Sequence, residues 1–391
     1  MPRYGEIFNT IERPFAFVDL DALDANIAYV KNACSDKQIR IATKSVRSVG
    51  LLHYIANRLP NCAGFMSFTA SETAFLLDQG LDNFLIGYPV FEQQTIEKLA
   101  QFVQQGKSIT FMVDAIEQVE LLHDVALKHN IVFSVCVDIN VSTNYKVLYF
   151  GTKRSPIHSL ERLRAFLTQI ESFNGVKVTG CMGYDAQIAG VTDMTTELFG
   201  IKSAFIRRLK KHSLPRLTRL RWDALAMLKS KYDLAFVNAG GSGSMHLLHN
   251  APDVTEITVG SAFFAPGLFS QYVALDLQPA VGFGLRVTRK FAHNVIVCHG
   301  GGYIASGAMG LDRLPQFLEP DYYTFTSREG AGEVQTPIVV KHREHEIGDT
   351  IYFRHAKAGE LCERFNELHA TRDGEYVGEI STYRGSGQCF L

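Results

Sequence analysis

The chain has 391 residues, of which 46% are hydrophobic and 20% are charged. This composition is ordinary for a globular protein with a sizeable core, and it excludes disordered and fibrous classes. The 39 basic and 40 acidic side chains leave a net charge of −1, which argues against a dedicated nucleic-acid-binding protein. The length suggests two domains, or one large barrel with an appendage, and small-molecule chemistry is the default expectation.

The N-terminal segment 1–14 carries charges throughout and has no apolar centre, so it does not read as a secretory signal. No apolar run approaches the roughly 18 residues that a membrane helix needs. The seven cysteines are scattered without a CxxC pair, which is typical of reduced thiols and not of a disulfide frame. The sequence therefore predicts a cytoplasmic protein with no membrane segment.

Eight short apolar runs alternate with helical patterns between about residues 38 and 264. They are IRIATK (39–44), GFMSFT (64–69), NFLIGY (83–88), ITFMVD (109–114), FSVCVDI (133–139), VTGCMGY (178–184), LAFVNAGG (234–241) and EITVGS (256–261). Most are continuous runs without strict alternation, as in strands that are covered on both faces. Eight strand–helix repeats predict a parallel (β/α)₈ barrel of the TIM type. A doubly wound open sheet is the main alternative, weakened because no GxGxxG follows the first strand.

The segment 205–232 is the most basic part of the chain. We expect two solvated helices that are broken near Pro215, because proline removes a helical hydrogen bond. A phosphate- or nucleic-acid-binding face is the alternative, but aromatic residues are nearly absent among the basic ones.

After about residue 266 the helical patterns fade, and short strand-like runs are separated by Gly, Asp and Pro. This change predicts a β-rich domain. The early strand FAFVDLD (15–21) is expected to join that domain, because the barrel already has eight candidate strands without it. The predicted division is a barrel over 20–265, and a β domain made of 266–391 together with 1–19.

Two features at the carboxyl ends of predicted barrel strands can carry chemistry, since functional groups of such barrels gather there. Lys44 closes the first strand, and a lysine amine can act as a nucleophile or form a Schiff base, or else simply extend to solvent. The run from Gly240 to Ser244 follows the seventh strand and can cradle a phosphate, or else form a flexible turn. Together they predict a site for pyridoxal 5'-phosphate (PLP), which needs both an amine and a phosphate-binding loop.

The chain contains the segments PFAFVDLDALDANI, IRIATKSVRS, GYDAQIAG, VNAGGSGS and EITVGS. In these segments it resembles the fold-type III PLP enzymes, namely alanine racemase, D-threonine aldolase and eukaryotic D-serine dehydratase. The resemblance to the D-threonine aldolase and D-serine dehydratase branch covers nearly the whole chain. In the C-terminal part, CHGGGYIASG, GAGEVQTP and FRHAKAGELCERF are similar to bacterial proteins labelled amino acid deaminase/aldolase.

The resemblance implies a set of site residues and a homodimer. Lys44 would form the internal aldimine with PLP. The other cofactor-binding residues would be Tyr184, Gln187, Gly241, Ser242, Gly243 and Ser244. In the relatives a histidine stands at the position of Gln187.

The resemblance also implies that His355 corresponds to a metal-binding histidine, found in a His-x-Asp or His-x-Cys pattern. Here the chain reads His355, Ala356, Lys357, and a lysine is a poor metal ligand that adds positive charge. We expect that the metal is absent and that Lys357 takes its electrostatic place. The alternative is that another group, such as Glu360 or Cys362, completes a metal site.

The expected function is that of a PLP-dependent lyase acting on a β-hydroxy amino acid of D configuration, by aldolase-type cleavage. Lys44 would serve as a base at Cα, and His355 would serve the β-hydroxyl, since imidazole exchanges protons readily. A dehydratase or deaminase ranks second and a racemase third, because only one base for Cα can be identified. A non-enzymatic PLP-binding protein is the alternative of another class, but the residues after the barrel would have little purpose there.

Overall fold

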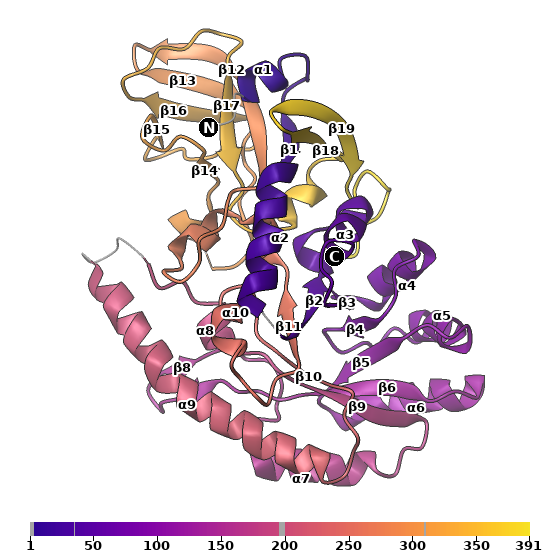
Figure 1. Ribbon diagram of the computed structural model, residues 1–391. Coiled ribbons are helices and arrows are strands. Elements are labelled where there is room, and N and C mark those ends of the chain that lie inside the picture. Colours follow the sequence, from indigo (N-terminus) through magenta and orange to yellow (C-terminus); the bar gives the residue numbers. More distant parts are fainter. Residues whose placement is uncertain (1–3, 35, 195–199, 309) are drawn as a thin grey trace.

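The computed structural model describes residues 4–34, 36–194, 200–308 and 310–391, which form a closed barrel and a nine-stranded sheet (Figure 1). The barrel strands are all parallel and follow the order β10-β11-β2-β3-β4-β5-β6-β9. They are β2 (Gln38–Ala42), β3 (Cys62–Ser67), β4 (Phe84–Ile86), β5 (Ile109–Val113), β6 (Phe133–Asp138), β9 (Val176–Gly183), β10 (Phe236–Ala239) and β11 (Glu256–Val259). Each of the eight predicted strands overlaps one of them, so the predicted (β/α)₈ barrel is confirmed.

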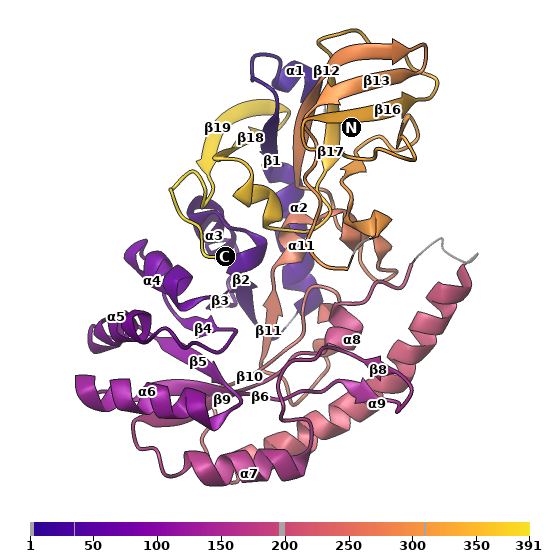
Figure 2. The same ribbon diagram turned by 180° about the vertical axis from the view of Figure 1, so that it is seen from behind.

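Helices surround the barrel strands on the outside (Figure 2). The longer ones are α2 (Leu20–Cys34), α3 (Val49–Ala56), α4 (Ala70–Asp78), α5 (Gln93–Gln104), α6 (Ile116–His129), α7 (Leu160–Ile170) and α9 (Ile201–Lys229). Three of them begin at a hydroxyl residue whose oxygen accepts a backbone N–H of the first turn: Ser48, Thr69 and Ser159. No helix within the described ranges is both long and apolar enough to cross a membrane.

The expectation of two helices broken near Pro215 is wrong. Helix α9 runs without a break from Ile201 to Lys229 with Pro215 inside it. Its second half is anchored by buried apolar side chains and by Arg221, which is buried and pairs with Asp253. This packing compensates for the hydrogen bond that proline removes, which a reading of local propensity cannot include.

The second sheet contains strands from both ends of the chain. Its main path is β15-β16-β13-β12-β1-β18-β19, and β17 pairs with β12 and β14. Strand β1 (Phe15–Asp19) lies between β12 and β18, and all five of its residues are buried. The other strands are β12 (Val281–Ala292), β13 (Val295–His299), β14 (Gln316–Phe317), β15 (Tyr323–Phe325), β16 (Gln335–Val340), β17 (Thr350–Arg354), β18 (Glu367–Arg372) and β19 (Glu375–Ser381). The predicted β-rich second domain is thus confirmed.

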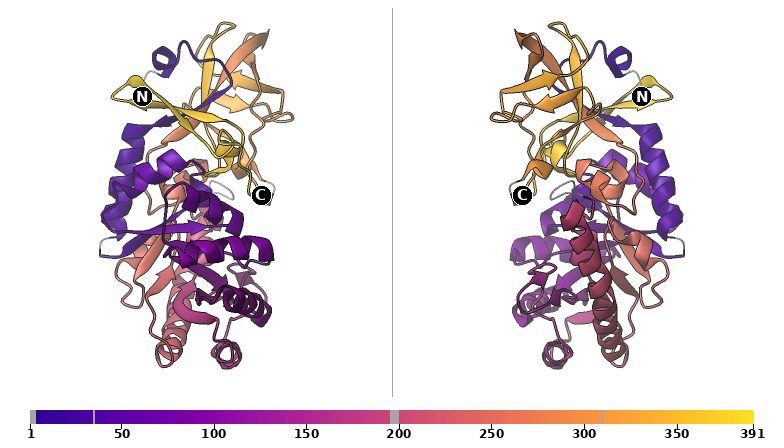
Figure 3. Two further views of the ribbon diagram at one scale, coloured as in Figure 1. Left: turned by 90° about the vertical axis from the view of Figure 1, so that its right-hand side faces the viewer. Right: turned by 90° about the vertical axis from the view of Figure 1, so that its left-hand side faces the viewer.

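The second sheet is stacked on one end of the barrel (Figure 3). The chain after β19 fastens the two parts, because Tyr383 is fully buried between them. Its N–H donates to the carbonyl of Arg47 at 2.8 Å, and its hydroxyl donates to Glu72 of α4 at 2.8 Å. The other Glu72 oxygen accepts the N–H of Phe68 at 2.9 Å. These bonds hold the end of the chain against the loop that follows β2.

The buried Glu72 carboxyl should make folding stability depend on pH. Burial raises its pKa to about 7 from an ordinary value near 4.5, although hydrogen bonds oppose the shift. Because the pKa of Glu72 is higher in the folded state than in the unfolded state, the protonated carboxyl makes its full contribution to stability below pH ~4.5. That contribution is lost as pH rises through about 7. The Glu72→Gln variant has no carboxyl to titrate at this position. As pH rises from 5 to 8, its free energy of unfolding should therefore increase by roughly 2–3 kcal/mol relative to that of the native protein.

The measurement is urea unfolding of the native protein and of the variant at both pH values. The matched control is Glu120→Gln, since Glu120 is an exposed glutamate on α6. The same pH slope in native protein and Glu72→Gln would contradict the assignment.

Candidate active site

A cavity of about 620 Å³ lies where the carboxyl ends of the barrel strands meet the second part of the chain. Many of its barrel residues come within three residues after a strand, as expected for this architecture. They include Lys44 after β2, Phe68 after β3, Tyr88 after β4, Tyr184 after β9, Gly240, Gly241 and Ser242 after β10, and Gly260 and Ser261 after β11. Ser306, Arg313, Lys357 and Glu360 line it from the second part. The cavity therefore belongs to both parts of the fold.

Lys44 lies in a short 3₁₀ turn (Thr43–Ser45) directly after β2, and its side chain reaches into the cavity. The Lys44 Nζ lies 3.5 Å from the Tyr88 hydroxyl. The Lys44 charge lowers the pKa of the Tyr88 phenol, and the nearby Arg154 guanidinium adds to that effect. The strand end thus presents a primary amine at the barrel mouth with a tyrosine beside it.

Arg154 is a cavity residue that the sequence analysis missed. Its Nε donates to Asp138 at 2.5 Å, and its Nη2 donates to the carbonyl of Gly87 at 2.6 Å. The guanidinium carbon lies 5.0 Å from the ring centre of Tyr88 and 6.0 Å from that of Tyr184. Two hydrogen bonds and two ring contacts fix this cation in the wall, where it can meet an anionic oxygen.

The loops after β10 and β11 form a wall of hydrogen-bond donors. The Ser242 hydroxyl accepts the N–H groups of Gly260 at 3.3 Å and Ala262 at 3.0 Å, which ties the two loops together. The N–H groups of Ser242 and Ser261 donate to no acceptor in the part of the chain that the structure describes. Gly240 has a φ of +82°, which favours glycine. Unpaired N–H groups and hydroxyls in such loops suit a phosphate.

Three of the expected cofactor-binding residues do not line the cavity. The Ser244 hydroxyl donates to the buried Asp185 carboxylate at 3.1 Å. Gly243 packs so closely that a Cβ there would lie 2.5 Å from the carbonyl oxygen of Ala189. Gln187 is fully buried and donates to the carbonyl of Val141 at 2.8 Å. The structure thus brings Lys44, Tyr184, Gly241 and Ser242 together at the cavity, and it places Gln187, Gly243 and Ser244 behind its wall.

His355 follows β17 and lines a second, smaller pocket of about 410 Å³, which we call the side pocket. Arg47, Ser306, Lys357 and Glu360 line both the side pocket and the main cavity, so the two adjoin. Burial lowers the pKa of His355 to about 4, so the ring is neutral at pH 7. Its Nδ1 lies 3.1 Å from the carbonyl oxygen of Val281, which requires a proton on Nδ1. The buried Nε2 has no hydrogen-bond partner among the described residues and is therefore a vacant acceptor.

Lys357 and Glu360 form an ion pair at the junction of the two pockets. The Lys357 Nζ lies 3.2 Å from a Glu360 oxygen and 2.8 Å from the Ser306 hydroxyl. Ser306 in turn donates its N–H and its hydroxyl to the two Glu360 oxygens, at 2.9 and 2.5 Å. Although burial opposes the effect, these bonds and the Lys357 charge lower the pKa of Glu360. Within the described ranges, no group of three or more His, Cys, Asp or Glu residues is placed to hold a metal ion.

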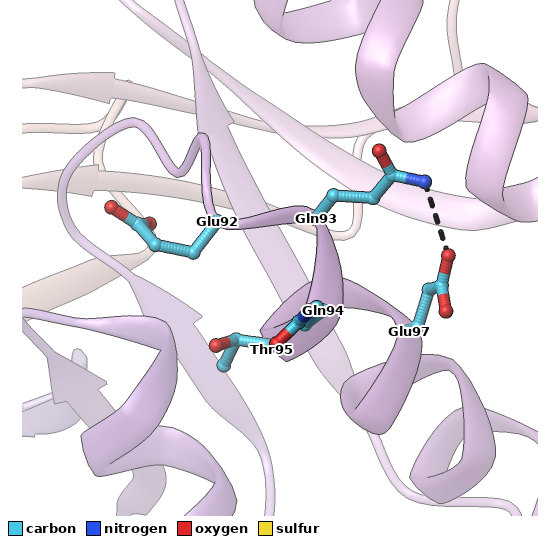
Figure 4. A pocket seen from close by; sticks show the side chains of 5 residues that line it. All are labelled: Glu92, Gln93, Gln94, Thr95 and Glu97. Carbon is cyan, nitrogen blue, oxygen red and sulfur yellow. Dashed lines mark hydrogen bonds between the residues drawn. The ribbon is translucent and has the colours of Figure 1, made fainter.

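A hollow at the start of α5 offers a contrast (Figure 4). It is lined by Glu92, Gln93, Gln94, Thr95 and Glu97, and Gln93 donates to Glu97 at 3.1 Å. All five side chains come from one stretch of six residues, and the two charged ones are acidic. Nothing in this set resembles the amine and donor wall of the main cavity.

Comparison with known proteins gives a family match over most of the chain. The family described as "Alanine racemase, N-terminal domain" matches residues 18–265. No curated protein matches the sequence.

Several solved structures share the fold at low sequence identity. D-threonine aldolase from Filomicrobium marinum is 17% identical with a TM-score of 0.81, over 97% of this chain and 96% of that one. D-threo-3-hydroxyaspartate dehydratase from Delftia sp. HT23 is 15% identical with a TM-score of 0.74, over 95% and 98%. Alanine racemase from Bacillus anthracis is 16% identical with a TM-score of 0.66, over 95% and 98%. At these identities the likeness establishes the fold.

Proposed function

The chain belongs to the alanine racemase N-terminal domain family, and from that premise we propose that it is a PLP-dependent enzyme that cleaves a β-hydroxy D-amino acid. One observation carries the proposal: the Lys44 amine and the donor wall at Ser242 and Ser261 face the same cavity. An amine and a phosphate site in one cavity are what this cofactor requires.

The residues of the main cavity fit PLP by chemistry and by size. The unpaired N–H groups of Ser242 and Ser261, with their hydroxyls, suit the phosphate. Met66, Met182 and Tyr184 supply wall for a flat aromatic ring. A cavity of about 620 Å³ lies within the usual range for small-molecule sites. We propose that Lys44, Tyr184, Gly241 and Ser242 contact the cofactor, and that Gln187, Gly243 and Ser244 support the wall from behind.

Ser242→Asp should cripple retention of PLP. The substitution places a carboxylate among N–H groups that suit a phosphate, and like charges repel. It also removes the hydroxyl that accepts from Gly260 and Ala262. We expect the cofactor affinity to fall by at least about tenfold, which corresponds to ~1.4 kcal/mol.

The affinity is measured by titrating apoprotein with PLP and following the absorbance of the bound cofactor. Ser172→Asp, at a serine just after α7 that does not line the cavity, is the control. Unchanged affinity in folded Ser242→Asp would place the phosphate elsewhere.

The chain's own residues can perform the proton transfers that cleavage requires. When bound, PLP supplies an electron sink that stabilises negative charge at Cα of an amino acid. The Lys44 amine can hold or return the proton at Cα, because it lies in the same cavity. The vacant His355 Nε2 is buried beside the side pocket, and it can accept the proton of a β-hydroxyl only after a side-chain movement that exposes it. Residues of the second part cover the mouth and limit access of water.

The state of His355 favours aldolase-type cleavage over dehydration. Cleavage of the Cα–Cβ bond requires a base that removes the β-hydroxyl proton, and a neutral ring offers its bare Nε2 for that role, as a weak base because burial lowers its pKa to about 4. Dehydration requires an acid that protonates the leaving hydroxyl. D-threonine aldolase, one of the solved structures with this fold, is named for a β-hydroxy D-amino acid, which supports the same substrate class here.

A dehydratase is the second candidate, favoured by the similar fold of D-threo-3-hydroxyaspartate dehydratase. Racemisation requires bases on both faces of Cα. The Tyr88 hydroxyl lies only 3.5 Å from the Lys44 Nζ, so these two groups approach from the same side. That geometry does not supply the second base.

The test is a panel of D- and L-β-hydroxy amino acids, with aldehyde, keto acid and ammonia measured separately. The proposal expects an aldehyde and glycine from D substrates. Keto acid with ammonia would replace it by the dehydratase. Bound PLP without any turnover would favour a non-enzymatic carrier. Sedimentation of the holoprotein tests the homodimer that we also propose.

A further inference from the structure

We propose that the side pocket takes no divalent cation, and that the Lys357 ammonium supplies the positive charge that meets a hydroxyl group of the substrate. The first half concerns this chain's residues alone, and the second rests on the proposed function. One solved structure with this fold is a mutant of D-threo-3-hydroxyaspartate dehydratase in the metal-free form.

The groups around His355 do not form a metal site. A divalent cation requires several free lone pairs, and carboxylate or thiolate ligands are the usual anionic ones. His355 offers a single lone pair, on Nε2, because Nδ1 donates to the carbonyl of Val281. Both Glu360 oxygens already accept hydrogen bonds from Ser306. Cys362 is buried and does not line the side pocket.

The charges of the side pocket also oppose a cation, because its lining side chains include three basic residues, Arg47, Lys357 and Arg364, against two acidic ones, Glu360 and Glu363. Lys357 stands where a ligand would be needed, two residues after His355, and its ammonium is held by two acceptors, Ser306 and Glu360. The ammonium and the Glu360 carboxylate balance each other. A divalent ion would have to displace the ammonium from the Glu360 carboxylate or lie next to the ammonium. Two positive charges in contact repel each other strongly.

The same groups are complementary to a hydroxyl. An ammonium has three N–H donors, and Ser306 and Glu360 take two of them, so one remains for a ligand. The His355 Nε2 is an acceptor. Lys357 lines both pockets, so this remaining N–H can be donated to a hydroxyl of the substrate. The substrate class that follows is an amino acid with a hydroxyl on its side chain, recognised without a metal.

The claim that the side pocket takes no divalent cation is tested by titrating Mn²⁺ into the purified holoprotein. Free Mn²⁺ is measured by electron paramagnetic resonance, alongside elemental analysis. Native protein should contain only traces of metal and bind no Mn²⁺. Lys357→Asp should bind about one Mn²⁺ per chain, because it removes the ammonium and adds a carboxylate two residues after His355. Lys211→Asp, at an exposed lysine of α9, is the control and should not bind.

Native protein that carries stoichiometric metal, or that binds Mn²⁺ as well as Lys357→Asp does, overturns the inference. A folded Lys357→Asp that binds no Mn²⁺ overturns the claim that Lys357 excludes the cation. If Lys357→Asp does not fold, Lys357→Ala replaces it, since that change removes the ammonium without adding a charge. In that variant Mn²⁺ binding should rise above the native level.

The claim that the Lys357 ammonium meets a hydroxyl of the substrate without a metal is tested by aldehyde release after exhaustive dialysis against EDTA. Native activity should survive, and Lys357→Ala should raise KM for the hydroxy amino acid while the absorbance of the bound cofactor stays unchanged. Activity that is lost to EDTA and restored by Mn²⁺ overturns this half. Failure of the proposed function would appear differently, as absence of turnover on every hydroxy amino acid with the Mn²⁺ result unchanged.

Discussion

Lys44→Ala should abolish turnover, with a fall in kcat/KM on the order of 10³-fold or more, the scale expected when a covalent catalytic group is removed. Lys44 is the lysine that follows a barrel strand directly and lines the main cavity beside Tyr88. In the proposed function, its loss removes both the amine that would hold PLP and the base for the proton at Cα. The measurement is aldehyde release from D-β-hydroxy amino acids by holoprotein reconstituted with excess PLP.

Borohydride reduction followed by peptide mass spectrometry gives an independent result for the same residue. In native protein the reduced cofactor should be attached to the peptide that contains Lys44. Lys153→Ala is a matched control, because Lys153 is exposed, neighbours Arg154 and does not line the cavity. Attachment to another lysine, or full activity in Lys44→Ala, would show that the amine has been misassigned.

His355→Ala should lower turnover by about 10²–10⁴-fold, the usual contribution of a general base, while the spectrum of bound PLP stays native. His355 lines the side pocket and is absent from the lining of the main cavity, so its replacement should affect the substrate's hydroxyl and not the cofactor. Steady-state kinetics and the absorbance of the holoprotein are compared with those of native enzyme.

The control for this variant is His293→Ala, at an exposed histidine in the turn between β12 and β13. It should match native enzyme in both measurements. Normal aldehyde release by His355→Ala would remove His355 from the mechanism. Loss of the cofactor spectrum would instead give it a role in holding PLP.

The sequence was sufficient for the barrel because its strands are covered on both faces. Each strand is then a short apolar run, which is visible without any tertiary information. Strand β1 is also a short apolar run. It was assigned to the other sheet only because the barrel already had eight candidate strands. The prediction of a break at Pro215 was wrong because it depended on local propensity alone. Helix α9 is stabilised by the packing of residues such as Leu217 and Arg221, which requires tertiary information.

The site was only partly accessible to the same reasoning. The rule that functional groups follow barrel strands selects Lys44 and Ser242, and applied to NFLIGY it would also have selected Tyr88. Arg154 carries no such signal, because it comes from the long connection between β6 and β9 and reaches the cavity through its bonds to Asp138 and Gly87. The amino-acid sequence of a turn also does not show which way each side chain points. The Ser244 hydroxyl, for example, points away from the cavity and donates to Asp185.

The position of β1 has a consequence for biosynthesis. Its neighbours β12 and β18 both follow the whole barrel in the chain, so β1 emerges from the ribosome long before either neighbour exists. Until then the nascent protein exposes an apolar strand with two free edges, which is a template for wrong pairing. The barrel can form during translation, but the sheet can only close after synthesis of β18. This order of events leaves the first strand without its neighbours for most of synthesis.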